Sequence, residues 1–272
     1  MFNDSGIYIE VSALLVYQWP PPGFGPGVFI LRYNQMTIRS AFYIDGFNAY
    51  HALDRLNQPH LKWLDWDALA KKIIPSRDET LERVVMCTAI KKNDYGKRTR
   101  HEFYLSALEQ KGVVCLKGHF AKDPRECRDC GYNWDAPVEK QGDVNLAISL
   151  IADAFNDKFD HCYLVTADGD QVATARMLRS QFPEKKITSV VIAGQKHNKS
   201  LLAECGGNGK TIKESELERA LFPKLISGPK AILRPQEYDP PAGWVHPSNR
   251  PQKQSKRKGA MPPAASTQQT PD

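Results

Sequence analysis

The sequence predicts an α/β fold in which a mostly parallel sheet carries helices on both faces, with disordered termini. Short apolar runs alternate along the chain with segments of helical periodicity, as they do in parallel sheets with crossover helices. Two of these runs are followed closely by aspartate and glycine. The chain has 272 residues, 41% of them hydrophobic and 25% charged, which suits one such domain with extensions.

Composition divides the chain into three parts. Residues 1–37 include a run rich in proline and glycine, from Pro20 to Gly27, that continues neither a helix nor a central strand. We expect this part to be a poorly ordered extension. Residues 38–226 form the predicted domain. Residues 227–272 are rich in Pro, Gln, Ser and Lys, so we expect a disordered basic tail.

Periodicity assigns the elements of the central part in order. Short apolar runs predict strands at residues 41–44, 81–90, 113–116, 162–165 and 187–192. Segments with apolar residues at helical spacing predict helices at residues 64–74, 98–111, 144–155, 172–180, 201–205 and 215–221. The stretch 121–138 shows neither pattern, and we expect it to be irregular.

Several protein classes are excluded by composition. No apolar stretch approaches the roughly 18 residues of a membrane helix, and the first basic residue is Arg32, so the start does not resemble a signal peptide. The six cysteines are therefore expected to be reduced, with Cys87 and Cys162 in the core. These observations predict a cytoplasmic protein without a membrane partner.

Acidic residues gather where two predicted strands end. Asp45 follows the first strand, and Asp168 and Asp170 follow the strand at 162–165, while Asp143 opens the helix before that strand. In open α/β sheets, ligands bind just beyond the carboxyl ends of the strands. Each acid alone is also a common turn or helix-start residue, so their joint placement carries the prediction.

Clustered carboxylates predict a divalent cation. The acids repel one another unless a cation compensates their charge, and Mg²⁺ and Mn²⁺ prefer oxygen ligands. Such an ion positions water against a phosphodiester.

Three motifs, in order, resemble those of the NYN domain, a branch of the PIN-like nuclease superfamily. They are FYIDGFN at residues 42–48, EKQGDVN at 139–145 and TADGD at 166–170. The resemblance covers roughly residues 38–222 and implies a Rossmann-like sheet with a metal-dependent ribonuclease site. It assigns metal ligation to Asp45, Asp143 and Asp168, places Asp170 at the edge of the acidic cluster, and makes Asn48 a polar neighbour that orients a ligand or a water.

Two positions depart from the family pattern. Gln171 stands where a hydrophobic residue is usual, and Ala167 stands in place of the usual glycine. Neither change removes a ligand.

A basic segment follows the strand at 81–90. Its basic residues surround Tyr95, which could stack on a base. We expect this loop, with Lys140 near the acids, to contact RNA, although a solvated charged loop is the ordinary alternative. The expected contacts are Lys91, Lys92, Tyr95, Lys97, Arg98, Arg100 and Lys140.

Cys127 and Cys130 have the C-x-x-C spacing of a zinc knuckle. A structural Zn²⁺ needs four ligands, and Cys115 and His119 are the nearest candidates to complete the set. The alternative is a pair of free loop thiols.

The sequence therefore predicts a metal-dependent ribonuclease, a hydrolase that acts on single-stranded RNA. The alternative is a non-catalytic RNA-binding or regulatory module on the same fold. A phosphatase of the haloacid dehalogenase type is disfavoured, because Phe47 stands where that family needs a second aspartate. Protein partners and oligomeric state are not indicated.

Overall fold

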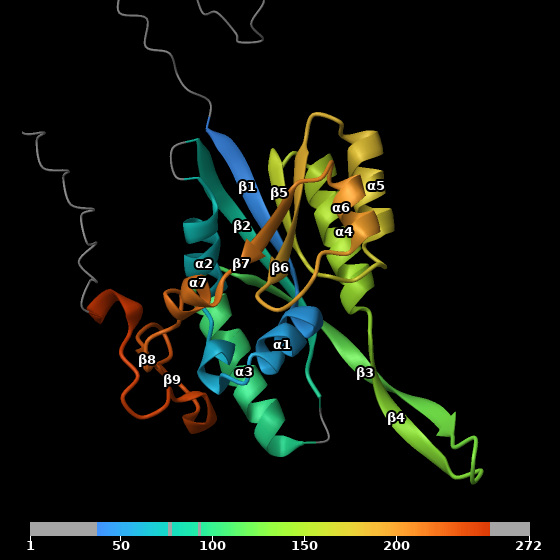
Figure 1. Cartoon of the computed structure of the whole chain (residues 1–272), viewed down its shortest axis with the longest axis vertical. Coiled ribbons are helices and arrows are strands. Elements are labelled where there is room, and N and C mark those ends of the chain that lie inside the picture. Colours follow the sequence, from blue (N-terminus) through green and yellow to red (C-terminus); the bar gives the residue numbers. More distant parts are fainter. Residues whose placement is uncertain (1–36, 76–77, 92–93, 251–272) are drawn as a thin grey trace, which may run out of the picture. The chain divides into compact units, whose positions relative to one another are not determined.

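A computed structural model describes residues 37–75, 78–91 and 94–250. Within these residues the main sheet has seven strands in the order β4-β3-β2-β1-β5-β6-β7 (Figure 1). All neighbouring strands are parallel except β3 and β4. The strands are β1 (Ile38–Asp45), β2 (Glu79–Ala89), β3 (Val114–Glu126), β4 (Asn133–Lys140), β5 (His161–Val165), β6 (Lys186–Ile192) and β7 (Gly209–Ile212).

Helices cover both faces of the sheet, so the predicted fold class is confirmed (Figure 1). One face packs against α1 (Gly46–Arg55), α2 (Trp66–Ile73), α3 (Tyr95–Gln110) and α7 (Glu214–Glu218). The other packs against α4 (Gly142–Phe155), α5 (Val172–Gln181) and α6 (Lys199–Glu204). Short 3₁₀ turns lie at Pro59–Lys62, Gln236–Tyr238 and Pro247–Asn249.

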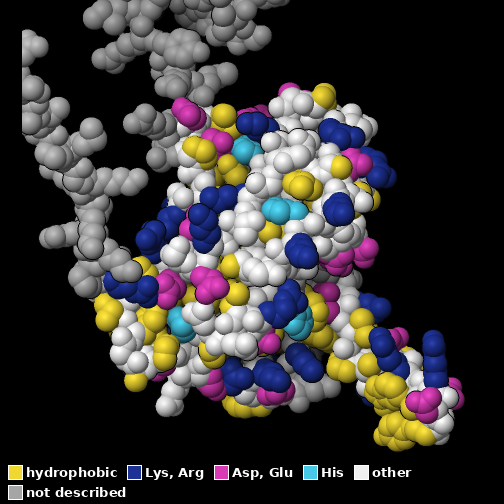
Figure 2. Space-filling view, viewed as in Figure 1, with side chains coloured by type: hydrophobic (Ala, Val, Ile, Leu, Met, Phe, Trp, Pro, Cys, Tyr) yellow, Lys and Arg dark blue, Asp and Glu magenta, His cyan; other side chains and the backbone are white. Residues whose placement is uncertain are grey.

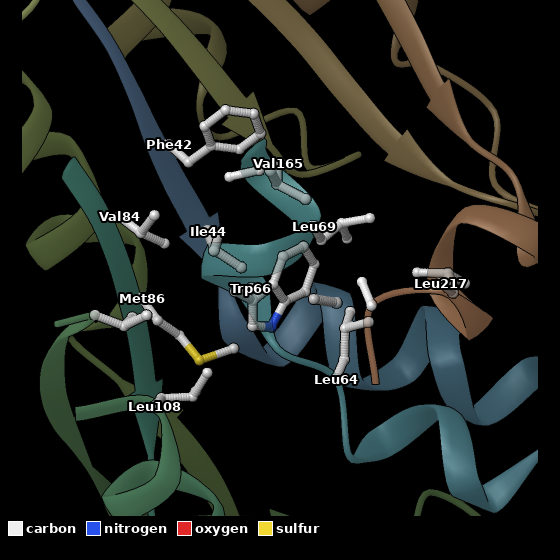
Figure 3. Packing of buried hydrophobic residues seen from close by; sticks show 14 of the residues in the cluster. Phe42, Ile44, Leu64, Trp66, Leu69, Val84, Met86, Leu108, Val165 and Leu217 are labelled. Carbon is white, nitrogen blue, oxygen red and sulfur yellow. The ribbon is translucent and has the colours of Figure 1, made fainter. Parts of the chain in front are cut away.

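Strand β1 separates two hydrophobic cores, because its side chains alternate between the faces of the sheet. Phe42 and Ile44 point into the core that contains α2 and α3, part of which is drawn in Figure 3. Ala41 and Tyr43 point into the core that contains α4 and α5. All four are almost completely buried, so β1 is covered on both faces.

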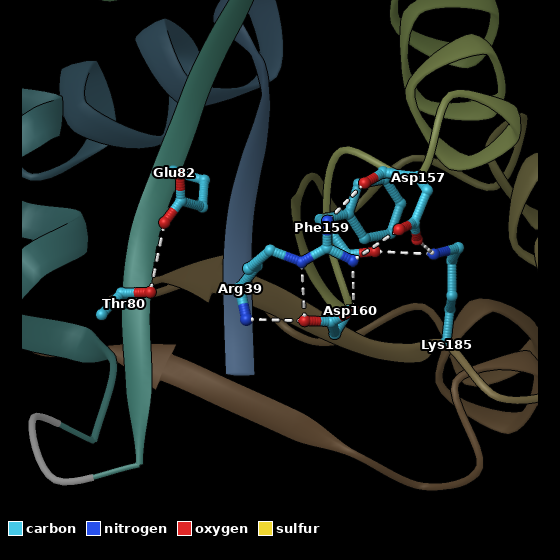
Figure 4. A network of polar contacts seen from close by, with 7 residues as sticks. All are labelled: Arg39, Thr80, Glu82, Asp157, Phe159, Asp160 and Lys185. Atoms are coloured by element: carbon cyan, nitrogen blue, oxygen red, sulfur yellow. Dashed lines mark hydrogen bonds and ion pairs between the residues drawn. The ribbon is translucent and has the colours of Figure 1, made fainter. Parts of the chain in front are cut away.

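A polar network fixes the amino end of β1, opposite the end that carries Asp45 (Figure 4). The Arg39 guanidinium donates to Asp160 and to Asp157 at 2.6 and 2.9 Å. Lys185 donates to Asp157 at 2.7 Å and to the Phe159 carbonyl at 2.8 Å. These bonds hold the turn between α4 and β5 against the first residues of β1.

The stretch 121–138 is not irregular, contrary to expectation. Most of it belongs to β3 and β4, which pair as a long antiparallel ribbon from His119 opposite Lys140 to Glu126 opposite Asn133. Most of the ribbon's side chains are exposed or only partly buried. Because neither face is consistently apolar, its sequence lacks the alternation by which a half-buried strand is recognised.

The packed part of the chain continues beyond residue 226, where the sequence placed the domain boundary. Strand β9 (Ile232–Leu233) pairs with β8 (Leu225–Ile226), Ile232 is buried in the α2 and α3 core, and Trp244 contacts His60. A few anchoring apolar residues thus order a segment whose average composition is polar. Residues 1–36 and 251–272 of the predicted extensions lie outside the described residues.

None of the helices within the described ranges combines the length and the apolar character needed to cross a membrane.

The position of Ile232 provides a test of this C-terminal packing. We expect Ile232→Ala to lower the free energy of unfolding by about 2–4 kcal/mol, because it removes a side chain that is only 3% exposed. Leu233→Ala is the matched control, since Leu233 is 57% exposed, and should change stability by less than about 0.5 kcal/mol. Urea titration followed by circular dichroism measures both, and equal effects would contradict this packing.

Candidate metal centre

Three carboxylates meet beyond the carboxyl ends of β1 and β5. Asp45 is the last residue of β1, Asp168 follows β5, and Asp143 lies in the first turn of α4. One oxygen atom from each lies within 4.8 Å of those from the other two. Sequence reasoning placed these three together, and the structure does the same.

The place of the cluster follows from the topology. The chain runs from β1 outward to β2 and β3 on one side, and β5, β6 and β7 continue on the other. The order of the sheet therefore reverses between β1 and β5, where open α/β sheets leave a crevice for ligands.

Hydrogen bonds fix the cluster before any ligand binds. Asp45 accepts the Asn48 backbone N–H at 2.9 Å and the Thr166 hydroxyl at 2.9 Å. The Thr166 oxygen in turn accepts the Asp168 backbone N–H at 3.1 Å. One hydroxyl thus links the carboxylate at the end of β1 to the backbone that carries Asp168.

Gly46 brings α1 close to β2 at this point. A Cβ atom at Gly46 would lie 2.8 Å from the Cys87 carbonyl oxygen and 2.8 Å from the Thr88 Cβ. The glycine at this position is therefore required by close packing. A larger residue would push the start of α1 away from the sheet.

The carboxylates disturb one another electrostatically. The pKa of Asp45 is raised to about 6, chiefly by burial and also by the neighbouring Asp143 and Asp168, against the opposing effect of its two hydrogen bonds. Burial, together with Asp168 and Asp170, also raises the pKa of Asp143.

This donor set fits a hard divalent cation. Three carboxylate oxygens, with room left for water on the exposed side, match the coordination that Mg²⁺ and Mn²⁺ take in proteins. Within the described ranges no other group of His, Cys, Asp or Glu is arranged to hold a metal ion. The residues present therefore fit the cation predicted from sequence, whose binding stays a prediction.

Asp170 and Asn48 do not join the ligand set. Asp170 is exposed, and its backbone N–H donates to Asp168 at 3.0 Å. The Asn48 side-chain oxygen accepts the Ala167 N–H at 3.2 Å and the Gln195 amide at 2.8 Å. Asn48 therefore ties α1 to the loops after β5 and β6, and positions the cluster without facing it.

Gln171 has a role that the sequence did not predict. Its side chain is buried, and its amide donates to the Asp143 carbonyl at 3.2 Å. The same amide lowers the pKa of the Asp143 carboxyl. The polar departure from the family pattern is thus a contact that holds the start of α4. The other missed participant, Thr166, carried no distinguishing sequence signal.

The basic segment is mostly a helix. Asp94 caps α3 by accepting the Lys97 N–H at 2.9 Å, so Tyr95, Lys97, Arg98 and Arg100 lie on its first turns. Lys91 precedes the helix and is exposed. Lys140 ends β4, and Lys92 lies outside the described residues. The sequence signal for the start of this helix is Asp94, because aspartate is a preferred N-cap residue.

The four proposed zinc ligands are not brought together. Cys127 and Cys130 lie at the turn between β3 and β4, where backbone N–H groups lower the pKa of the Cys127 thiol. His119 instead contacts Gln141 at 3.1 Å, and Cys115 pairs with Met86 in the sheet. Strand β3 is longer than the predicted strand, so the turn with Cys127 and Cys130 lies at the opposite end of the ribbon from His119. The cores enclose Cys87 and Cys162, as expected.

A cavity of about 330 Å³ opens at the start of α1, and none of the three carboxylate residues lines it. Gly46 and Phe47, which directly follow Asp45, line it, and so does Thr88 at the end of β2. Its other walls come from α1, α3 and the base of the ribbon.

Comparison with known proteins identifies an enzyme among the relatives. The chain is 26% identical to 6-hydroxy-3-succinoylpyridine 3-monooxygenase HspA from Pseudomonas putida over 245 residues, which cover 76% of this chain and 77% of that protein. No known protein family profile matches the chain. The resemblance to the NYN domain therefore stays a prediction.

Solved structures give only distant likenesses. A protein of unknown function from Vibrio parahaemolyticus has a TM-score of 0.42 and 19% identity over 65% of this chain and 94% of its own. A hypothetical protein from Neisseria gonorrhoeae with bound ppGpp has a TM-score of 0.20 and 15% identity over 65% of this chain and 86% of its own.

The prediction of ribonuclease activity is wrong, because the relative is named as a monooxygenase. That relative is an enzyme, which agrees with the prediction of an enzyme, but it points to an oxidoreductase and does not support a nuclease or any other hydrolase. The physical reason for the error is that carboxylates hold a cation whatever reaction takes place beside it. Motifs that specify such a site therefore leave the reaction open.

The raised pKa of Asp45 predicts that this residue weakens the metal-free protein. Its carboxyl group titrates near pH 6 in the folded chain but has an ordinary value of 3.8. Between these values the unfolded chain loses its proton first, so stability falls as the pH rises, by about 1.4 kcal/mol per unit. Asp45→Asn has no proton to lose.

We therefore expect the free energy of unfolding of metal-free Asp45→Asn to be up to about 3 kcal/mol higher than that of the wild type at pH 7. The gain should disappear near pH 4. Thermal and urea unfolding in chelator at several pH values measure it. Asp67→Asn, at the start of α2, is the control without such a pH-dependent gain. A variant less stable than the wild type at pH 7 would refute this account of the cluster.

Proposed function

We propose that this chain is a monooxygenase that oxidises a small aromatic substrate beside a divalent cation held by Asp45, Asp143 and Asp168. The observation that carries the proposal is the monooxygenase relative, whose likeness covers about three quarters of both chains (76% and 77%). The cavity that begins at Gly46 and Phe47, the two residues after Asp45, supports it, since an enzyme of this kind must enclose an organic molecule.

The reaction needs an electron donor in addition to the substrate and O₂. In a monooxygenation one atom of O₂ forms a new carbon–oxygen bond on the substrate, and the other atom leaves as water. Two electrons and two protons balance this change. We propose that they come from a reduced nicotinamide or flavin supplied from solution or by a partner protein.

The cation has an electrostatic role in this proposal. When bound, it would polarise an oxygen atom of the substrate and stabilise negative charge on it. Asp45, Asp143 and Asp168 hold it, and either Mg²⁺ or Mn²⁺ suits an all-oxygen donor set.

Three further residues keep the ligands in place. Thr166 joins Asp45 to the Asp168 backbone, Gln171 holds the start of α4 that carries Asp143, and Asn48 ties α1 to the neighbouring loops. They are positioning residues, because each acts through a ligand or its backbone. A fixed ligand set costs little reorganisation when the cation binds.

Two other predictions from the sequence remain proposals. Single-stranded RNA remains a proposed partner of the basic residues of α3. Cys127 and Cys130 remain proposed ligands of Zn²⁺. Within the described part of the chain, no third ligand joins them. Neither bears on the oxidation proposed above.

The reaction can be tested with the substrate named for the relative. The purified chain is incubated with 6-hydroxy-3-succinoylpyridine, Mn²⁺, reduced nicotinamide or flavin, and ¹⁸O₂. We expect mass spectrometry to find one labelled oxygen atom in the product. Asp143→Asn and Asp168→Asn should each reduce the rate about 100-fold or more, because each removes a cation ligand.

The matched control is Asp67→Asn. Asp67 lies in the first turn of α2, as Asp143 does in α4, but pairs with Lys71 away from the cluster. Its substitution should leave the rate within about twofold. Incorporation of label from water instead of O₂, or oxidation that continues undiminished in both cluster variants, would overturn the proposal.

A further inference from the structure

The cavity beside the cluster has walls made mainly of aromatic side chains. Rings from five separate parts of the fold line it, which gives a ligand flat apolar surfaces on several sides. These rings belong to Phe47, Tyr50, Trp66, Tyr104, Phe120 and Tyr238. Phe47 and Tyr50 are substantially exposed, so they lie where a ligand would enter.

The charged side chains of the cavity all have one sign. Lys62, Lys91, Lys97 and Arg100 line it, together with two histidines, and none of the described lining residues is acidic. Basic side chains gather on this face over α1 and α3 (Figure 2). The cavity therefore favours an anion.

Acids outside the lining balance only part of this charge. Asp54 pairs with Lys62, Asp94 approaches Lys97 at 3.5 Å, and Glu237 pairs with Arg100 at 2.6 Å. Lys91 forms no ion pair with any described residue. These pairs hold the cations at the cavity wall and leave donor N–H groups for a ligand, since an ammonium has three and a guanidinium five.

Two polar groups add directional contacts in the interior. Burial lowers the pKa of His101 to about 4, so the ring is neutral at pH 7, and its Nε2 lies 3.4 Å from the Thr88 hydroxyl. The indole N–H of Trp66 lies near the Tyr104 hydroxyl without reaching hydrogen-bonding geometry with any acceptor. Trp66 is 1% exposed. A buried donor that lacks an acceptor is costly unless a ligand supplies one.

We infer that this cavity binds an aromatic carboxylate, with the ring between the aromatic walls and the carboxylate held by Lys97 and Arg100. This inference rests on the proposed function and names its substrate class. The cavity opens beside Asp45, because Gly46 and Phe47 line it.

The size of the cavity favours a small molecule of one or two rings. Its 330 Å³ lies at the lower end of the roughly 300–1,000 Å³ of small-molecule sites. A nucleotide also combines a ring with negative charge, so it is the competing ligand to test. A bare anion such as inorganic phosphate would leave the aromatic walls in contact with water.

Direct binding to the full chain tests the inference without any turnover. Isothermal titration in chelator compares pyridine-3-carboxylate with pyridine-3-carboxamide, an uncharged molecule of nearly the same shape, and with adenosine monophosphate. We expect the carboxylate to bind about 10-fold or more tightly than the amide, because a charge-assisted hydrogen bond is lost in the amide. The carboxylate's affinity should fall as salt is added.

Neighbouring basic residues on α3 provide the matched variants. Lys97→Gln and Arg100→Gln should each weaken binding of the carboxylate about 5- to 10-fold and leave the amide unchanged. Arg98→Gln is the control, because Arg98 pairs with Glu102 and does not line the cavity. Unchanged melting temperatures show that the variants are folded.

The outcomes separate this inference from the proposed reaction. Binding of the carboxylate without ¹⁸O incorporation refutes the monooxygenase and keeps the cavity assignment. Equal affinity for the carboxylate and the amide, no binding of either, or selective binding of adenosine monophosphate overturns the assignment. Asp67 pairs with Lys71 and does not line the cavity, so Asp67→Asn should leave carboxylate binding unchanged.

Discussion

The position of β1 between two parallel neighbours constrains the rest of this structure. Its register with β2 and β5 is fixed at the amino ends by a buried carboxylate, Glu79, which accepts hydrogen bonds from Ser40 on β1 and from His161 and Tyr163 on β5. Burial of an acid is tolerated there because hydrogen bonds satisfy it. Since the side chains of a strand alternate between its faces, a slip of one residue in this pairing would exchange the two cores and turn Asp45 away from the crevice.

The opposite end of β1 follows the reverse logic. There burial, together with two neighbouring acids, raises the pKa of Asp45, whereas at Glu79 the effect of burial is outweighed by the hydrogen bond from Ser40 and the contacts with His161 and Tyr163, which lower the pKa. The two ends thus use the same chemical group for different purposes. One acid stabilises the sheet, while the other is held at a cost in stability that a cation would remove. Such a cost is typical of sites organised for a ligand rather than for folding.

Sequence reasoning predicted the parts of this fold that repeat a simple period. The apolar runs identified β1 and β5, and the rule that ligands bind at the carboxyl ends of parallel strands brought Asp45 and Asp168 together correctly. It failed at the ribbon of β3 and β4, because these two exposed strands pair with each other and need no apolar face, so their sequence shows no alternation. It expected Asn48 to orient a ligand or a water, whereas the Asn48 side-chain oxygen binds the Ala167 N–H and the Gln195 amide, because spacing does not tell which groups a side chain reaches. The reaction class was missed for a deeper reason, since carboxylates that bind a cation are common to many chemistries.

The ribbon that carries Cys127 and Cys130 leaves β4 as an edge of the sheet. An exposed edge strand offers unpaired backbone groups to any other chain and is a frequent starting point for aggregation. Pro137 lacks an N–H donor in the middle of this edge, and Asp135, Glu139 and Lys140 place charges along it. These residues would interrupt a regular hydrogen-bonded pairing with an added strand. The same strand that helps to enclose the cavity is thereby protected from recruiting neighbours in a concentrated solution.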